Sequence, residues 1–249
     1  MKSDVVRLFQ TLPHPCGYFA DRTAQNLVID PAAPQLSRLY PAALAQGYRR
    51  AGGHVYRPHC RGCSACIAAR IPVDTFEPDR SQRRCLIRNA DLDATLTPAR
   101  LDDEQFDLYR RYLDSRHAGG GMDNPAPDDF SRFLYTAWSP TWFLELRRHG
   151  RLLATAVTDI ADNGLSAVYT YFDPDEPARG LGTCAILHQV ALARERGLPH
   201  VYLGFWIAHH PKMDYKARFR SLEVLAANGW QTLNPAWPES RTDDRRAGT

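Results

Sequence analysis

Alternating hydrophobic and polar positions predict several strands in the C-terminal half of the chain. Residues 142–147 and 152–160 alternate in this way, and residues 166–172 form a third alternating run. Between the last two runs lies Ala161-Asp162-Asn163-Gly164, and an Asn-Gly pair favours a tight hairpin turn. The pattern therefore predicts strands of which two are joined by a hairpin.

The pattern changes after residue 172. A Pro- and Gly-rich stretch at 173–181 predicts a loop, and apolar positions at helical spacing predict a helix over 183–196 that ends at Gly197. Residues 200–207 predict a further strand. The order of strand, hairpin strand, glycine loop, helix and strand resembles the core of the acyl-CoA N-acyltransferase (GNAT) fold.

The first hundred residues are richer in Pro, Gly and Arg and predict a loop-rich α+β region. A helix is expected over 102–116, followed by a Gly-rich hinge or site loop at 117–122. We therefore expect an α+β protein with a smaller cysteine-containing region at 1–100 and a GNAT-like acyltransferase domain at 101–237. The polar residues 238–249 predict a frayed tail.

Composition narrows the class of protein. The chain has 249 residues, 44% of them hydrophobic, and no apolar run approaches the roughly 20 residues of a membrane helix. Its start is a poor signal peptide, and its six cysteines are too sparse for a disulfide-rich secreted module. A cytoplasmic location is the expectation.

Basic residues are unevenly distributed, although the net charge is only +3. Between Gly47 and Arg100 there are 10 arginines and 5 acidic residues, which leaves +5 on that segment. Arginine forks suit phosphate or carboxylate, and a solvated basic face is the plainer alternative.

Four cysteines in the N-terminal region suggest a metal site. The C-x-x-C-x-x-C motif consists of Cys60, Cys63 and Cys66, and Cys16 lies upstream. Thiolates suit zinc or an iron–sulfur cluster. The alternative is a set of small thiols that stabilise a turn or respond to redox conditions. Cys85 and Cys184 lie in apolar contexts and are expected to be packing residues.

The glycine loop carries a second candidate site. Gly180 and Gly182 precede the predicted helix, and such a turn presents backbone N–H groups to anions. Pro177 occupies the position at which acetyl-CoA enzymes carry Gln or Arg, which argues against coenzyme A as the ligand. A tight entry into the helix is the structural alternative.

Several motifs in order along the chain resemble bacterial aminoacyl-tRNA–protein transferases, and more narrowly the aspartate/glutamate leucyltransferases, relatives of the eukaryotic arginyltransferases. The matching segments are 15–18, 47–50, 56–66, 76–84, 88–92, 165–174, 180–183, 198–207 and 212–216. The chain departs from arginyltransferases at Cys16, which has no C-x-x-C partner, and in its spaced rather than adjacent downstream cysteines.

The resemblance implies transfer of leucine from Leu-tRNA to the α-amine of proteins that begin with Asp or Glu, which marks them for degradation. Arginyl transfer to the same acceptors is the nearest alternative. A zinc-ribbon-like RNA-binding protein with an inactive acyltransferase fold and an acetyl-CoA N-acetyltransferase are two others. A monomer is the default expectation for the oligomeric state.

Ester aminolysis of this kind requires positioning, a neutral amine and stabilisation of the oxyanion. The residues expected to bind the acidic acceptor or the donor side chain are Arg80, Gln82, Arg83, Arg84, Arg88, Tyr169 and Trp206. Phosphate binding is the alternative for the four arginines, and core packing is the alternative for the two aromatic residues.

The remaining candidates concern tRNA and catalysis. Contacts with tRNA are expected from Arg49, Arg50, Arg57, Gly180 and Gly182. Tyr215 and Lys216 follow the last predicted strand, where the tyrosine could orient a reactant and the lysine could meet phosphate or the oxyanion. A surface pair at a strand end is the plainer interpretation.

Overall fold

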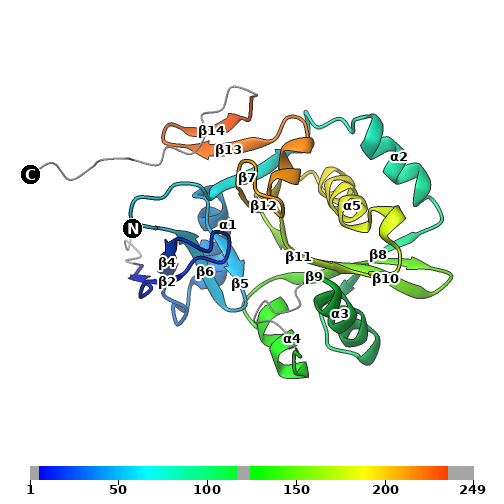
Figure 1. Ribbon diagram of the computed structural model, residues 1–249, viewed down its shortest axis with the longest axis horizontal. Coiled ribbons are helices and arrows are strands. Elements are labelled where there is room, and N and C mark those ends of the chain that lie inside the picture. The colour runs from blue at the N-terminus through cyan, green and yellow to red at the C-terminus, as the bar shows by residue number, and fades with distance from the viewer. Residues whose placement is uncertain (1–5, 117–123, 235–249) are drawn as a thin grey trace, which may run out of the picture.

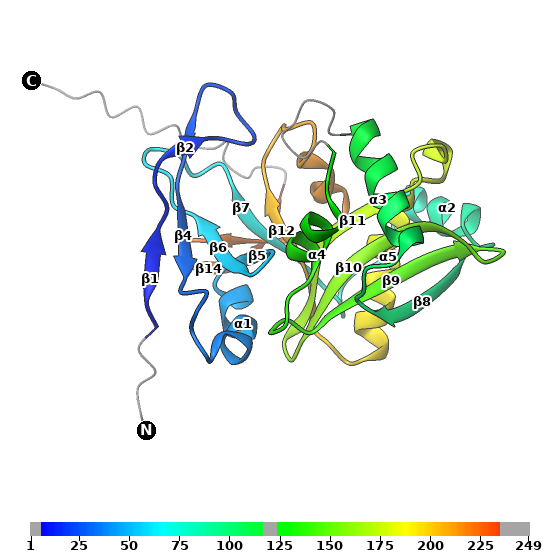
Figure 2. The ribbon, with the colours of Figure 1, turned by 90° about the horizontal axis from the view of Figure 1, so that it is seen from below.

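The computed structural model describes residues 6–116 and 124–234 and contains two main sheets (Figures 1 and 2). The smaller sheet, in the N-terminal part, has the strand order β1-β4-β6-β5. Its elements are β1 (Leu8–Gln10), β4 (Asn26–Ile29), α1 (Leu36–Ala45), β5 (Arg49–Ala51) and β6 (His54–Pro58). A short antiparallel pair, β2 (His14–Pro15) and β3 (Thr23–Ala24), lies beside it.

The larger sheet has eight strands in the order β14-β13-β7-β12-β11-β10-β9-β8. In chain order these are β7 (Ile67–Pro72), β8 (Asp93–Pro98), β9 (Thr141–Arg148), β10 (Arg151–Ala161), β11 (Gly164–Phe172), β12 (His200–Trp206), β13 (Glu223–Ala226) and β14 (Gly229–Thr232). All its pairs are antiparallel except β11–β12.

Helices cover both faces of this sheet, as Figure 1 shows. On one face lie α2 (Arg80–Arg88) and α5 (Leu181–Glu195), and on the other lie α3 (Asp103–Arg116) and α4 (Pro127–Leu134). Alternation along the strands supplies a core to each face: Leu144 and Ala156 pack towards α5, while Phe143 and Val157 pack towards α3 and α4. Two 3₁₀ segments, η1 (Pro177–Arg179) and η2 (Asp214–Arg218), complete the described elements.

The structure confirms the predicted α+β class and the acyltransferase-like order. The four predicted strands of the C-terminal half are β9, β10, β11 and β12, and the predicted hairpin joins β10 to β11. The predicted helices are α3 and α5, and α5 begins two residues earlier than expected, at Leu181. The expected hinge at 117–122 and tail at 238–249 lie outside the described residues.

The predicted boundary at residue 100 does not match the division between the sheets. β7, which belongs to the first hundred residues, lies in the middle of the large sheet, between β12 and β13. β8 forms the opposite edge of the same sheet. The chain therefore passes from the small sheet to the large sheet between Pro58 and Ile67, because β7 pairs on both sides with C-terminal strands.

None of the described helices is long and apolar enough to cross a membrane.

Candidate active site

The parallel strands β11 and β12 diverge where the site begins. They pair only at Leu165–Val201 and Ser166–Tyr202, although β11 continues to Phe172 and β12 to Trp206. Each strand remains paired with its outer neighbour, β10 or β7, along its full length. The carboxyl ends of β11 and β12 are therefore not joined to each other, and a ligand can approach the backbone there.

A bulge in β12 shapes one side of this region. The register with β7 shifts between Tyr202 and Gly204, and Gly204 has φ +71°. A side chain at Gly204 would lie 3.4 Å from Nη1 of Arg49, which comes from β5 of the N-terminal sheet. Glycine at the bulge therefore gives the arginine room beside the strand. Strand β5 also packs against β11, so the N-terminal sheet forms part of the site.

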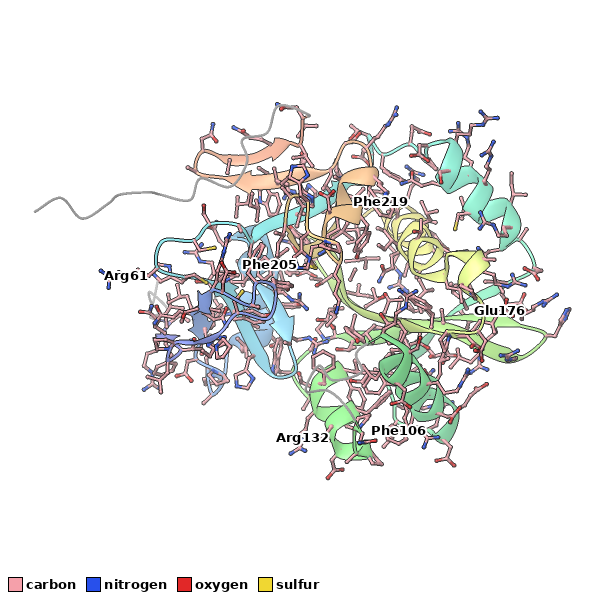
Figure 3. The ribbon with its side chains drawn as sticks, in the orientation of Figure 1. Arg61, Phe106, Arg132, Glu176, Phe205 and Phe219 are labelled. Carbon is pink, nitrogen blue, oxygen red and sulfur yellow. The ribbon has the colours of Figure 1, made fainter. Side chains whose placement is uncertain are left out.

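Aromatic rings surround the Arg49 guanidinium. Its carbon atom Cζ lies 5.9 Å from the ring centroid of Tyr56 and 5.8 Å from that of Phe205. The two rings are 6.1 Å apart in an edge-to-face arrangement. Figure 3 shows Phe205 at the junction of the two sheets. We call Arg49, Tyr56, Phe205, Tyr215 and Lys216 the Arg49 cluster.

The predicted catalytic pair, Tyr215 and Lys216, belongs to this cluster. Both lie on η2, where Tyr215 is exposed and Lys216 is buried. The Nζ of Lys216 lies 5.8 Å from the ring centroid of Tyr215 and donates a hydrogen bond to the carbonyl oxygen of Phe205. Burial, and then the charge of Arg49, lower the pKa of Lys216 to about 7. Near neutral pH this amine therefore populates both protonation states.

Trp206 was predicted to line the substrate pocket, but it lies in the core with 5% of its surface exposed. Its indole N–H donates a hydrogen bond of 3.1 Å to Oδ1 of Asp214, the first residue of η2. Trp206 therefore fixes the segment that carries Tyr215 and Lys216, and its contribution to the site is indirect.

The four N-terminal cysteines lie next to the Arg49 cluster. A cavity of about 300 Å³ is lined by Cys60, Cys63 and Cys66 together with Arg57 and Phe205. Burial raises the pKa of Cys66 to about 12, and the other three thiols, including that of Cys16, add to the effect. The cysteine motif thus faces the same junction between the sheets as the predicted catalytic residues.

The geometry of these thiols does not itself build a metal centre. Across residues 6–116 and 124–234, no three Cys, His, Asp or Glu side chains converge as ligands of one ion. Cys60 instead accepts a hydrogen bond from the Gln25 backbone N–H at 3.4 Å, and Cys63 accepts one from Arg22 at 3.5 Å. The donor set suits zinc or an iron–sulfur cluster chemically, but its present arrangement does not.

The glycine turn opens α5 on the other side of the diverging strands. Gly180 is the N-cap residue, with φ +66°, and Gly182 lies in the first turn. The carbonyl oxygen of Gly180 accepts the N–H groups of Thr183 and Cys184, both at 3.0 Å. The first N–H groups of a helix are directed outwards and suit an anion, as predicted for the tRNA end.

Of the four predicted arginines of α2, Arg88 lies at this turn. Arg80, Arg83, Arg84 and Arg88 are all exposed. Arg88 donates a hydrogen bond to the carbonyl oxygen of Ala178, two residues before Gly180. For Arg88, this placement favours the phosphate alternative over the predicted acceptor pocket.

Two predicted binding residues have structural roles instead. Gln82 is 4% exposed, completes the capping box of α2 with Asp79, and donates its amide to the Arg218 carbonyl oxygen at 3.2 Å. Arg50 is 1% exposed and forms a buried ion pair with Asp159, so its guanidinium cannot reach tRNA. Neighbouring arginines in the sequence, Arg49 and Arg50, thus point to opposite sides of β5.

Tyr169 lies on β11 among aromatic rings of α3 and α4. Its centroid is 6.2 Å from that of Tyr112 and 5.2 Å from that of Phe133. Its hydroxyl oxygen is buried, and no described residue offers it a hydrogen bond. An unsatisfied buried hydroxyl next to diverging strands is consistent with the predicted contact with a substrate.

Sequence reasoning missed Gly204 and Tyr56 as parts of the site. A glycine inside an otherwise apolar strand is a recognisable signal of a bulge or of close approach by another group. Tyr56 gave no such signal, because only the pairing of β6 with β5 brings it next to Arg49.

Comparisons with known proteins extend over both parts of the chain. Residues 14–84 match the family described as arginine-tRNA-protein transferase, N terminus, and residues 104–226 match its C terminus. A solved structure of a DUF2156 C-terminal domain from Agrobacterium fabrum overlaps 73% of this chain and 61% of its own, with 16% identity and a TM-score of 0.48.

Curated relatives match almost end to end. Proteins named aspartate/glutamate leucyltransferase are 57% identical in Stenotrophomonas maltophilia K279a, covering 94% of this chain and 95% of the relative, and 49% identical in Xylella fastidiosa 9a5c, covering 96% of each. The Pseudomonas aeruginosa LESB58 relative of the same name is 48% identical and covers 92% and 97%. With both halves of the chain matched by the family models, and with relatives of this identity and coverage, the chain belongs to the aminoacyl-tRNA–protein transferase family, together with the bacterial aspartate/glutamate leucyltransferases.

Proposed function

We propose that this transferase moves leucine from Leu-tRNA to the α-amine of proteins whose first residue is Asp or Glu. The relatives named aspartate/glutamate leucyltransferase support this donor and these acceptors. The structural observation that carries the proposal is the pair of diverging strands, with an anion-binding helix start on one side and the cationic Arg49 cluster on the other.

The reaction is an aminolysis that balances without a further reactant. The α-amine nitrogen attacks the carbonyl carbon of the leucyl ester, and an amide bond forms. The bond from that carbon to the ribose oxygen of the terminal adenosine breaks, and the released hydroxyl takes up the proton that the amine gives up. The ester is already activated, so positioning of the two reactants supplies much of the acceleration, up to about 7–11 kcal/mol in well-oriented cases.

Each side of the site suits one reactant. The backbone N–H groups at Gly180 and Gly182, with the exposed arginines of α2, suit the phosphates at the end of the tRNA. On the other side, Lys216 has a pKa near 7, so its neutral amine can accept the proton of the attacking α-amine, directly or through water. The hydroxyl of the exposed Tyr215 beside it can donate a hydrogen bond to the oxyanion.

The test is transfer of labelled leucine from Leu-tRNA to peptides that begin with Asp or Glu. We expect transfer to these peptides and none to a peptide that begins with Lys. Arg-tRNA in the same assay separates leucyl from arginyl transfer. Efficient use of Arg-tRNA with no use of Leu-tRNA would contradict the proposed donor.

A metal at the cysteine motif stays a prediction, and no step of the reaction depends on it. Zinc would bring the thiols of Cys16, Cys60, Cys63 and Cys66 together and fix the loop beside the Arg49 cluster; an iron–sulfur cluster would do the same. Elemental analysis of anaerobically purified protein tests it, with the Cys63→Ser variant as the comparison. Less than a tenth of an equivalent of zinc or iron in the unaltered protein would contradict the prediction.

A further inference from the structure

Arg49 differs from Arg50 in that aromatic rings, rather than an anionic group of the described residues, surround its guanidinium. It is half-buried, yet none of the described carboxylates or carbonyl oxygens accepts a hydrogen bond from its guanidinium. Its neighbour Arg50 satisfies the same group with Asp159 and two carbonyl oxygens. A guanidinium that is partly removed from water without a counter-charge is unfavourable, and such a group is a candidate binding site for an anion.

The surroundings of Arg49 favour a planar anion. Tyr56 and Phe205 flank the guanidinium, and the absence of a side chain at Gly204 lets the arginine lie close against β12. Aromatic walls on two sides hold the fork in one orientation, so that its N–H groups keep a fixed direction. A planar carboxylate fits a guanidinium held in this way through two parallel hydrogen bonds.

The strand that carries Arg49 lies away from the expected phosphate site. Arg49 comes from β5, which contacts α4 through the hydrogen bond from the Gly52 N–H to the Phe133 carbonyl oxygen. That contact places β5 on the face of the large sheet opposite α5, whose N-terminus carries the glycine turn (Figure 1). Because the proposed function assigns the tRNA phosphates to that turn, the side-chain carboxylate of the acceptor is the remaining anionic group that Arg49 can bind.

The charge of the cluster also suits the amine that must react. A protein amino terminus has an ordinary pKa near ~8, and a positive environment lowers it. Arg49 and Lys216 are close enough for the arginine to lower the lysine pKa, so an α-amine held beside them is shifted towards its neutral, nucleophilic form. One residue can thus attract the acidic side chain and disfavour the protonated amine next to it.

We propose that Arg49 binds the side-chain carboxylate of the acceptor's N-terminal Asp or Glu and thereby sets the acceptor specificity. The inference rests on the proposed function, because that function supplies the acidic acceptor. It moves acceptor recognition from the arginines of α2 to β5, and it replaces the tRNA contact predicted for Arg49.

Two measurements test the inference separately from the function. The first is the affinity for a fluorescent peptide that begins with Asp, and for its Asn counterpart, without tRNA. We expect Arg49→Gln to weaken binding of the Asp peptide by about 10- to 100-fold, the range for a hydrogen bond to a charged group, and to change binding of the Asn peptide little. Arg49→Lys keeps the charge without the fork and should fall between the two. Arg132→Gln, an exposed arginine on α4 (Figure 3), is the matched control.

The second measurement is leucine transfer, with the affinity for Leu-tRNA recorded for each variant. We expect KM for the Asp peptide to rise in Arg49→Gln while Leu-tRNA affinity stays within about twofold. Weakened Leu-tRNA binding with an unchanged Asp-peptide affinity would overturn the inference in favour of a phosphate contact. Equal affinity of unaltered protein and Arg49→Gln for the Asp peptide, or no affinity in either, would also overturn it.

The two proposals can fail independently. If the unaltered protein transfers no leucine but Arg49→Gln still loses the Asp peptide, the donor assignment fails and the acceptor site stands. Thermal unfolding and circular dichroism of each variant verify that a loss of binding does not come from loss of the fold.

Discussion

Arg50 and Asp159 form a buried two-bond ion pair that joins the N-terminal sheet to the large sheet. The Nε–Oδ2 distance is 2.7 Å and the Nη2–Oδ1 distance is 2.8 Å, and neither side chain is exposed. Tyr40 and Thr141 donate further hydrogen bonds to the same carboxylate, at 2.9 and 2.7 Å. This pair fixes β5 against β10, and so it fixes where Arg49 enters the site.

Removal of one member of this pair should be strongly destabilising. Arg50→Met leaves the Asp159 carboxylate buried without its cation, which costs about 3–5 kcal/mol of the free energy of unfolding. Urea denaturation at pH 7 measures the loss. Arg132→Met, which removes an exposed ion pair with Asp129, is the control and should cost about 1 kcal/mol or less. A similar small loss for both variants would contradict the role given to Arg50.

Lys216 should make stability depend on pH. Its pKa falls from 10.5 in the unfolded chain to about 7 in the folded protein, so between these values the unfolded state binds more protons. The free energy of unfolding therefore rises with pH in this window, by at most about 1.4 kcal/mol per pH unit, and the contribution is absent below pH 7. Lys216→Met removes this contribution.

Denaturation of the unaltered protein and of Lys216→Met between pH 7.5 and 9.5 measures the difference. We expect the advantage of the methionine variant to shrink as pH rises, because the proton that Lys216 gives up on folding costs less free energy to release at higher pH. The difference between the two proteins cancels the titration of other groups. A constant difference across the window would show that Lys216 is protonated in the folded protein.

The sequence predicted more of the fold than of the site. Alternation in 142–172 and helical spacing in 183–196 identified the hairpin strands and α5, because these elements are long and their pattern is local to the sequence. β7 was not predicted as a strand of this sheet, because its partners β12 and β13 lie far along the chain and the surrounding Pro and Gly residues are typical of a loop. Pairing over such distances leaves no local pattern.

Adjacent arginines show why site residues were harder to assign. Arg49 and Arg50 are indistinguishable in the sequence, yet one lies in an aromatic enclosure and the other in a buried ion pair. The side on which each points depends on the register of β5 with β6, which the sequence does not reveal. Gln82 and Trp206, predicted to bind substrate, instead form hydrogen bonds that hold α2 and η2.

A negative charge at the start of α5 should weaken donor binding. Gly182 lies in the first helical turn. The carboxylate introduced by Gly182→Asp interacts favourably with the positive end of the helix dipole but repels a bound phosphate. We expect about tenfold weaker Leu-tRNA binding than in Gly182→Asn, which has nearly the same shape and meets Phe172 in the same way. The difference should shrink between 0.05 and 0.3 M salt, because counterions screen it. Equal affinities at low salt would argue against the glycine turn as the phosphate site.

Gly204 and Gly197 allow a matched test of the space around Arg49. Both have positive φ, +71° and +65°, a conformation that asparagine tolerates better than other side chains. An added side chain at Gly204 points at Arg49, whereas one at Gly197 meets nothing within 4 Å. Gly204→Asn should therefore engage the guanidinium with its own carbonyl oxygen and raise KM for the Asp peptide about tenfold, a competition with an effect near 1.4 kcal/mol. Gly197→Asn should leave KM unchanged, and it should lower Tm by about as much as Gly204→Asn does. Steady-state transfer assays and thermal melts of both variants distinguish the two effects. A rise in KM of equal size in both variants would mean that backbone strain, rather than occupation of Arg49, governs acceptor binding.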